Sequence, residues 1–265
     1  MHNIGVNSKR NKTNKFIKPN TFVCGDFRKI MQQIKPKSVD CIFTSPPYNI
    51  GKKYDLYNDH KKYRTYLSFL RKAWKLSRDC LKDDGRLIIN VPSITCQRKN
   101  RPLYADVIRQ CQELNYVMRA DIVWHKQSIS KRTAWGSWKS PSSPYVVQPY
   151  EFILVFQKSR DKFKHIGEKK DIDITKDEFI NFSNALWNIK PETTLSRYHP
   201  APFPYELAYR IIKFYTYRGD IILDMFGGTG TTALACAKNG RKFIYCDISK
   251  KYRDFAKKRI DNARK

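Results

Sequence analysis

A glycine-rich segment between two apolar runs most constrains the fold of this 265-residue chain. The first run, 221–225, has the length of a buried strand, and Thr231-Thr232 begin a helix that we expect to end near Gly240. Between them lie Gly227, Gly228 and Gly230. Glycines allow a tight turn and a close approach of a ligand to the backbone. The segment therefore predicts a strand, a turn and a helix that seat a ligand at the edge of a sheet.

The next apolar run, 243–246, ends at Asp247. An acid at the tip of the second strand is where ribose hydroxyls are held in dinucleotide-type sites. An isolated glycine-rich turn would indicate only a structural turn, but strand, turn, helix, strand and acid together favour a nucleoside ligand. The segment is not a phosphate loop, because no Gly-Lys-Ser/Thr follows it.

Apolar runs of strand length alternate with amphipathic stretches along the rest of the chain. Expected strands are 39–43, 87–91, 122–124, 152–156, 221–225 and 243–246. Expected helices are 63–81, a stretch after Pro204, and 231–239. This alternation predicts an α/β domain with a mainly parallel sheet. We interpret Asp83-Asp84-Gly85 as a turn before a strand.

Charge and cysteine content limit the classes of partner. Lys and Arg number 52 against 24 Asp and Glu, which gives a net charge of +28 and favours a polyanion such as nucleic acid over anionic membrane. The seven cysteines have no CxxC spacing and indicate reduced thiols, and the histidines lack ligand spacing, so no metal site is expected. Without an 18-residue apolar run or the hydrophobic core of a secretory signal, we expect no membrane association and a cytoplasmic location.

A second informative segment, Thr44-Ser45-Pro46-Pro47-Tyr48, follows the expected strand 39–43. Two prolines stiffen the backbone and leave carbonyl oxygens free to accept hydrogen bonds. An aromatic amine is a poor nucleophile, because its lone pair is delocalised into the ring. If the Ser45 hydroxyl and the Pro46 carbonyl accept from such an amine, its lone pair can be directed at a methyl donor. Tyr48 would then stack on a base withdrawn from a duplex, whereas the plainer interpretation is a proline turn.

These motifs and their order resemble the β-class DNA amino-methyltransferases of restriction-modification systems, over roughly residues 22–260. The resemblance implies a three-layer Rossmann-like fold in permuted motif order, S-adenosyl-L-methionine as cofactor, and double-stranded DNA as partner. It implies an adenine contact for Asp26 and contacts to the methionine moiety for the segment 199–204. The implied cofactor-binding residues are Asp26, Thr44, His199, Pro200, Ala201, Phe203, Asp224, Phe226, Gly227, Gly228, Gly230, Thr231 and Asp247. The implied catalytic residues are Ser45, Pro46, Pro47 and Tyr48.

The resemblance also divides the chain. We expect a basic arm over 1–20, a catalytic half over 21–160, a target-recognition insert over 161–192 and a cofactor-binding half over 193–265. Trp135, Trp138 and Lys139 lie in a basic and aromatic loop, 126–150, for which DNA contact is favoured over surface packing. The resemblance further implies a cognate restriction endonuclease and a homodimer as candidate partners.

The identity of the methylated amine depends on Ser45. Within the family, adenine N6 enzymes commonly carry an acid at this position, whereas Ser-Pro-Pro-Tyr is more typical of cytosine N4 enzymes. We therefore predict methylation of cytosine N4, with adenine N6 as the alternative. An RNA or protein-amide methyltransferase and a non-catalytic DNA-binding module are less favoured. Methylation at cytosine C5 needs a thiolate nucleophile, usually after proline, and no Pro-Cys occurs.

Overall fold

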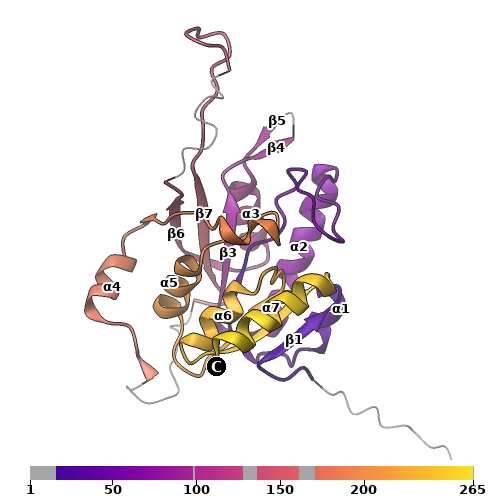
Figure 1. The fold of residues 1–265 in the computed structure, drawn as a ribbon, viewed down its shortest axis with the longest axis vertical. Coiled ribbons are helices and arrows are strands. Elements are labelled where there is room, and N and C mark those ends of the chain that lie inside the picture. The colour runs from indigo at the N-terminus through magenta and orange to yellow at the C-terminus, as the bar shows by residue number, and fades with distance from the viewer. Residues whose placement is uncertain (1–15, 98, 128–135, 161–170, 265) are drawn as a thin grey trace, which may run out of the picture.

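The computed structural model describes residues 16–97, 99–127, 136–160 and 171–264 (Figure 1). Most of the basic arm, Trp135, and residues 161–170 of the expected recognition insert lie outside these ranges. An eight-stranded sheet runs through the molecule in the order β1-β10-β9-β2-β3-β7-β6-β8. The first five strands are mutually parallel, β7 is antiparallel to both of its neighbours, and β8 pairs in parallel with β6. The predicted mainly parallel α/β sheet is confirmed.

The strands have these bounds: β1 Thr21–Cys24, β2 Val39–Thr44, β3 Leu81–Pro92, β6 Val117–His125, β7 Tyr150–Gln157, β8 Leu186–Asn188, β9 Ile221–Asp224 and β10 Lys242–Asp247. A short hairpin consists of β4 Thr95–Gln97 and β5 Lys99–Arg101. The helices are α1 Phe27–Ile30, α2 Tyr63–Cys80, α3 Leu103–Glu113, α4 Lys176–Phe182, α5 Tyr205–Tyr215, α6 Thr231–Lys238 and α7 Lys250–Ala263. In the described part of the chain, 3₁₀ turns span Met31–Gln33 and Thr194–Arg197.

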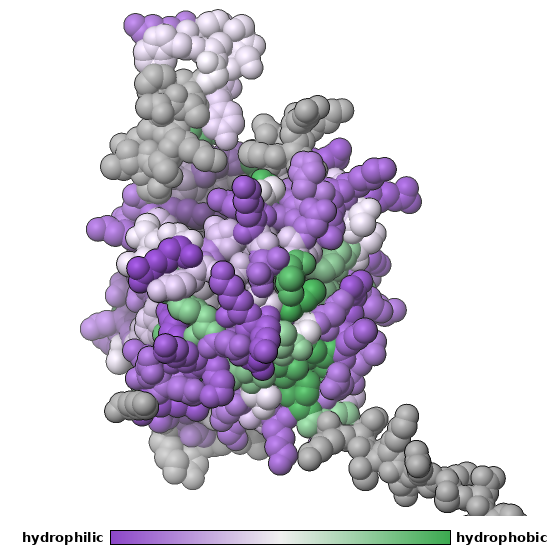
Figure 2. Space-filling view, turned by 45° about the vertical axis from the view of Figure 1, so that its right-hand side comes forward, coloured by the Kyte–Doolittle hydropathy of each residue, from purple (hydrophilic) through white to green (hydrophobic). Residues whose placement is uncertain are grey.

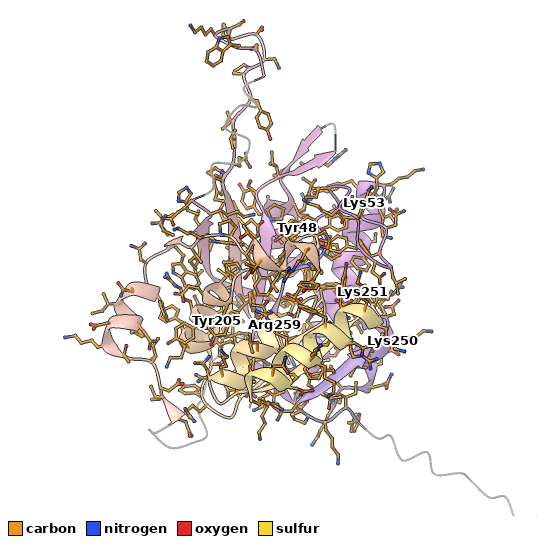
Figure 3. All side chains as sticks on the ribbon, in the orientation of Figure 1. Tyr48, Lys53, Tyr205, Lys250, Lys251 and Arg259 are labelled. Atoms are coloured by element: carbon orange, nitrogen blue, oxygen red, sulfur yellow. The ribbon has the colours of Figure 1, made fainter. Side chains whose placement is uncertain are left out.

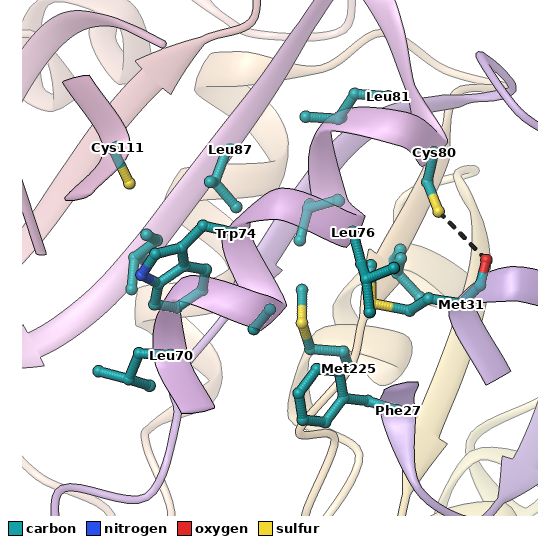
Figure 4. Packing of buried hydrophobic residues seen from close by; sticks show 14 of the residues in the cluster. Phe27, Met31, Leu70, Trp74, Leu76, Cys80, Leu81, Leu87, Cys111 and Met225 are labelled. Atoms are coloured by element: carbon teal, nitrogen blue, oxygen red, sulfur yellow. Dashed lines mark hydrogen bonds between the residues drawn. The ribbon is translucent and has the colours of Figure 1, made fainter. Parts of the chain in front are cut away.

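Helices cover both faces of the sheet, which gives three layers (Figure 1). Because successive strand residues point to opposite faces, Ile42 of β2 packs with α1, α2 and α3, whereas its neighbours Cys41 and Phe43 pack with α5, α6 and α7. On the first face, Trp74 of α2 is fully buried near Leu87 of β3 (Figure 4). The central strands are thus covered on both sides, as expected of parallel strands.

One local expectation is wrong. Asp83, Asp84 and Gly85 do not form a turn before a strand, because β3 already begins at Leu81. The pairing of β2 with β3 shifts there, since Val39 pairs with Leu81 but Cys41 pairs with Arg86. The extra residues of β3 therefore form an irregularity within the strand, and a Cβ on Gly85 would make tight contacts, 3.0 Å from both Leu81 Cδ2 and the Lys82 carbonyl oxygen.

Three further findings concern thiols, metal ligands and membrane-spanning helices. The six cysteines whose side chains are described carry free thiols. Within the described residues, no group of three or more His, Cys, Asp or Glu side chains is placed to hold a metal ion. No helix in the described part of the chain is both long and apolar enough to cross a membrane.

Candidate functional site

The two motifs singled out in the sequence meet at the carboxyl edge of the sheet. β2 and β9 are parallel neighbours, with Ile42 opposite Leu223, so the segments that follow them leave the sheet side by side. The hydroxyl of Thr44, the last residue of β2, donates a hydrogen bond to Asp224 Oδ1 at 2.8 Å. The segment Ser45-Pro46-Pro47-Tyr48, called the proline loop below, and the segment 225–230, called the glycine turn, are therefore joined by a buried side-chain contact. Ligands of open α/β sheets bind at this edge.

Asp224 is hydrogen-bonded to each of the segments that meet at this junction. Besides Thr44, its carboxylate accepts hydrogen bonds from the Thr232 hydroxyl at 2.7 Å and from the Phe226 backbone N–H at 3.1 Å. Complete burial raises the pKa of Asp224 to about 6, while the bonds from Thr232 and Thr44 act in the opposite direction. The carboxylate therefore holds β2, the glycine turn and α6 in one arrangement.

The glycine turn is closely packed. A Cβ on Gly227 would lie 2.2 Å from the Tyr245 ring, and the Tyr245 hydroxyl donates to the Gly228 carbonyl at 2.8 Å. Gly230 has a φ of +76° at the start of α6, and a Cβ there would lie 2.6 Å from the Cβ of Ala256. Only glycine meets both conditions, left-handed backbone and close approach, at this position.

A cavity of about 600 Å³ opens beside this junction, a volume suited to a nucleoside-sized ligand. Figure 2 shows apolar side chains exposed on a face that is otherwise largely hydrophilic. The predicted site residues that line the cavity are Asp26, Ser45, Pro46, Pro47, Tyr48, His199, Ala201, Phe226 and Asp247. The cavity lining does not include Thr44, Pro200, Phe203, Asp224, Gly227, Gly228, Gly230 or Thr231. Of this second group, Thr44, Asp224 and Thr231 are buried.

Aromatic rings form one part of the lining. Phe226, which follows β9, lies 5.2 Å from Phe27 and 5.8 Å from Phe69, measured between ring centroids, and Tyr57 lies 5.5 Å from Phe69. Asp26 stands next to Phe27, where it caps α1 and binds the Arg28 guanidinium through both carboxylate oxygens. The hydrogen bond from Arg28 lowers the pKa of Asp26. This part of the cavity offers flat apolar faces beside a carboxylate.

Asp247 lies at the tip of β10, as the sequence predicts. One carboxylate oxygen accepts from the Gly228 N–H at 2.9 Å and the other from the Ser249 N–H at 2.8 Å. Burial raises the pKa of Asp247, and these backbone bonds act in the opposite direction. A carboxylate has about four acceptor positions, and the backbone N–H groups of Gly228, Ile248 and Ser249 leave one of them for a ligand hydroxyl.

His199 lies between two tyrosines of the lining, 4.7 Å from Tyr252 and 5.4 Å from Tyr54 by ring centroids. Its Nδ1 accepts from the Ala201 N–H at 3.2 Å. Burial lowers the pKa of His199 to about 4, so the ring is neutral at physiological pH. The segment 199–204 thus contributes an uncharged wall, and its Phe203 packs on Phe43 of β2 at 5.3 Å.

The loop after Tyr48 lines the cavity, although the sequence suggests for it only a share in reading DNA and marks none of its residues as cofactor-binding. Asp59, buried in this loop, accepts backbone hydrogen bonds from Asn49, Ile50 and Lys52. Asp55 accepts from the Ser249 hydroxyl at 2.6 Å, which ties the loop to the start of α7. No motif marks these carboxylates in the sequence, because their partners are backbone groups and a residue far along the chain.

Three polar residues next to the proline loop were also missed: the buried Asn90 and Glu151, and the half-buried Lys126. The Tyr48 hydroxyl donates to Glu151 Oε2 at 2.7 Å, and Asn90 Nδ2 donates to the Tyr48 oxygen at 2.8 Å. Lys126 forms an ion pair with Glu151 Oε1. Figure 3 shows Tyr48 near the middle of the molecule, whereas Lys53, Lys250 and Lys251 lie toward its periphery.

A long loop projects from the body of the molecule between β6 and β7 (Figure 1). In its described part, 126–127 and 136–149, the Trp138 side chain is 61% exposed, and Lys139 Nζ lies 5.6 Å from a Trp138 ring centroid. Tyr145 and Val146 are exposed as well. An aromatic side chain paired with a cation and turned to solvent is suited to contact with nucleic acid.

Comparison with known proteins extends this picture. A family model described as DNA methylase, which covers N6 and N4 methyltransferases, matches residues 39–258. The chain is 38% identical over 173 residues to the Type II methyltransferase M.MjaVI of Methanocaldococcus jannaschii, covering 65% of this chain and 87% of that protein.

Solved structures agree. One is TTHA0409 of Thermus thermophilus, described as a putative DNA modification methylase and complexed with S-adenosyl-L-methionine. It has a TM-score of 0.73 and 27% identity, and the match covers 90% of this chain and 92% of that chain. The cytosine-N4-specific PvuII DNA methyltransferase shares the fold, with a TM-score of 0.70, 19% identity, and coverage of 92% of this chain and 87% of that chain.

Proposed function

The chain belongs to the N6/N4 DNA methylase family and uses S-adenosyl-L-methionine, and from that premise we propose that it methylates the exocyclic N4 of cytosine in double-stranded DNA. The observation that carries the choice of base is Ser45, a neutral hydroxyl at the first position of the proline loop. A neutral acceptor is weaker than a carboxylate, and Ser-Pro-Pro-Tyr is more typical of cytosine N4 enzymes than of adenine N6 enzymes. Adenine N6 is the alternative product.

The cavity suits the cofactor. The aromatic group of Phe27, Phe69 and Phe226 would hold an adenine, Asp247 would accept from ribose hydroxyls, and the segment from His199 to Ala201 would border the methionine part. When bound, S-adenosylmethionine supplies a methyl group on positive sulfur, whose C–S bond breaks, with its electron pair left on sulfur, as the N–C bond forms. Ser45 lines the same cavity, so the amine and the methyl group can meet.

The proline loop would receive a base turned out of the duplex. Tyr66 of α2 donates to the Pro47 carbonyl at 2.7 Å, which fixes the loop against the body of the domain. Ser45 and the Pro46 carbonyl then accept from the target amine, and the Tyr48 ring borders the base. The relatives of Type II further suggest a role in restriction-modification.

The test is the identity of the product. Purified protein is incubated with duplex DNA and isotopically labelled S-adenosylmethionine, and the DNA is digested to nucleosides and analysed by mass spectrometry. We expect labelled N4-methylcytosine, and none with Ser45→Ala. Labelled N6-methyladenine would instead establish the alternative, and in a parallel incubation with RNA, label in RNA but not in DNA would refute the substrate.

A further inference from the structure

A chain of hydrogen bonds runs from Ser45 at the cavity through the Tyr48 hydroxyl to the buried carboxylate of Glu151. Ser45 and Tyr48 follow β2, Asn90 lies near the end of β3, and Glu151 lies at the start of the antiparallel β7, where it is opposite Pro92 of β3. The carboxyl edge of the parallel strands and the amino end of β7 coincide, so these side chains converge. Asn90 and Glu151 are buried, whereas Ser45 lines the cavity.

The distances define the order of the chain. Ser45 Oγ lies 2.9 Å from the Tyr48 hydroxyl oxygen, which lies 2.7 Å from Glu151 Oε2. Asn90 Nδ2 lies 2.8 Å from the same tyrosine oxygen and 2.7 Å from Glu151 Oε2. The other carboxylate oxygen of Glu151 is paired with Lys126. Every link is within hydrogen-bond range.

The direction of each hydrogen bond follows from the groups themselves. A carboxylate can only accept, so the single Tyr48 proton must be donated to Glu151. The bond between Tyr48 and Ser45 then has only one possible donor, the Ser45 hydroxyl. Because that proton points toward Tyr48, Ser45 can offer the cavity only its lone pairs. The hydroxyl of Ser45 is thereby held as an acceptor, which is the state that activation of an amine requires.

We propose that Glu151 is the positioning residue that fixes Ser45 as a hydrogen-bond acceptor, and that it receives, through Tyr48 and Ser45, the proton that the target amine loses. The inference rests on methylation of an amine in this cavity and holds for cytosine and adenine alike. Asn90 supports this arrangement, because its Nδ2 contacts both the Tyr48 oxygen and Glu151 Oε2 and so holds the two groups against each other.

The proton balance is simple. When the new N–C bond has formed, the amine nitrogen carries one N–H proton in excess. That proton passes to Ser45 Oγ as Ser45 gives its own proton to the Tyr48 oxygen, and Tyr48 gives its proton to Glu151 Oε2. Both hydroxyls end as they began, and Glu151 becomes a neutral acid. Burial and the adjacent charge of Glu151 raise the pKa of Tyr48, so this hydroxyl passes a proton on and does not ionise.

Glu151→Gln tests the proposal. The amide of Gln can donate a hydrogen bond to Tyr48, which reverses the direction of the hydrogen bonds between residue 151, Tyr48 and Ser45, but it cannot take up the proton. The matched control is Asp40→Asn. Asp40 is 8% exposed and is paired with Lys82, much as Glu151 is 8% exposed and is paired with Lys126, but it lies at the opposite end of β2. The readouts are the single-turnover rate of methyl transfer to duplex DNA, the calorimetric affinity for S-adenosylhomocysteine, and urea denaturation.

We expect Glu151→Gln to slow methyl transfer by about 100-fold, the scale of general acid-base catalysis, and to change the affinity for S-adenosylhomocysteine by less than about twofold. Asp40→Asn should transfer methyl groups at the wild-type rate. Glu151→Asp should restore much of the rate. Asn90→Asp in the Glu151→Gln background should also restore it by at least roughly tenfold, because it places a carboxylate beside the same tyrosine oxygen.

Three results would overturn the proposal: a wild-type rate in Glu151→Gln, an equal loss of rate in Asp40→Asn, or no recovery with either acidic variant. If Glu151→Gln fails to unfold cooperatively, Tyr48→Phe replaces it, since it removes only the hydroxyl that joins the chain. A comparable slowing is then expected, and an unchanged rate would again refute the proposal. Product analysis is independent, because N6-methyladenine would refute the choice of cytosine and leave the role of Glu151 intact.

Discussion

Thr44→Val probes the junction between the two motifs. Valine matches the shape of threonine but removes the hydroxyl that donates to Asp224 Oδ1. Asp224 keeps its bonds from Thr232 and from the Phe226 N–H, so the substitution removes one of three stabilising contacts to a buried carboxylate. A hydrogen bond to a charged group contributes about 1.5–3 kcal/mol, and one between neutral groups about 0.5–1.5 kcal/mol.

The loss should therefore depend on pH. Because the pKa of Asp224 is about 6, raised from 3.8 by burial, its neutral form is favoured by folding. The contribution of neutral Asp224 to the free energy of unfolding is complete below pH ~4 and is lost as the pH rises through about 6. It amounts to roughly 3 kcal/mol, at 1.36 kcal/mol per pKa unit. The Thr44 hydrogen bond lowers this pKa, so Thr44→Val should raise the pKa of Asp224 further. The substitution should therefore destabilise the protein more when Asp224 is ionised than when it is neutral.

Urea denaturation at pH 5 and pH 8 measures the effect. We expect Thr44→Val to lower the free energy of unfolding by about 2 kcal/mol at pH 8 and by about 1 kcal/mol or less at pH 5. Thr44→Ser is the control, because it keeps the hydroxyl and loses one methyl group, with a similar cost of about 1 kcal/mol at both pH values. Equal losses for Thr44→Val at the two pH values would refute the stabilisation of ionised Asp224 by the Thr44 hydroxyl.

Three other predictions follow from the cavity and the projecting loop. Gly227→Ala should destabilise the protein by about 1–3 kcal/mol and weaken S-adenosylhomocysteine binding in calorimetry, because its Cβ would overlap the Tyr245 ring; unchanged values would contradict the packing. The pKa of His199, lowered to about 4, makes stability fall as pH drops from about 6.5 to 4. His199→Gln should lose less stability than the wild type over that range, and a parallel loss in both proteins would count against a buried neutral ring. Trp138→Ala should weaken DNA binding in fluorescence anisotropy by about tenfold without changing S-adenosylhomocysteine affinity, whereas unaltered DNA binding would exclude the loop from the interface.

The sequence predicts the central sheet well, because its signal is local. All six expected strands correspond to β2, β3, β6, β7, β9 and β10, and the three expected helices correspond to α2, α5 and α6. Two longer helices, α3 and α7, were not predicted, although both carry a narrow apolar stripe. In α7 the buried residues Tyr252, Ala256 and Ile260 are separated by a mostly charged sequence, which hides their spacing.

The site is less predictable, because its polar contacts join distant parts of the chain. Gly227 and Asp224 stand out through their motif, yet their structural role in packing and bracing depends on Tyr245 and Thr44. Glu151 is 103 positions from Tyr48, and only the pairing of β7 beside β3 brings the two together. Spacing in the sequence carries no signal for such a contact.

The central claim is that the proline loop and the glycine turn form one cavity in which the methyl donor faces Ser45. A crystal structure of the protein with S-adenosylhomocysteine tests it most directly. We predict the adenine beside Phe226, the ribose hydroxyls at Asp247, and the sulfur on the side of the cavity formed by Ser45. A ligand bound outside this cavity, or bound with its sulfur turned away from Ser45, would contradict the account.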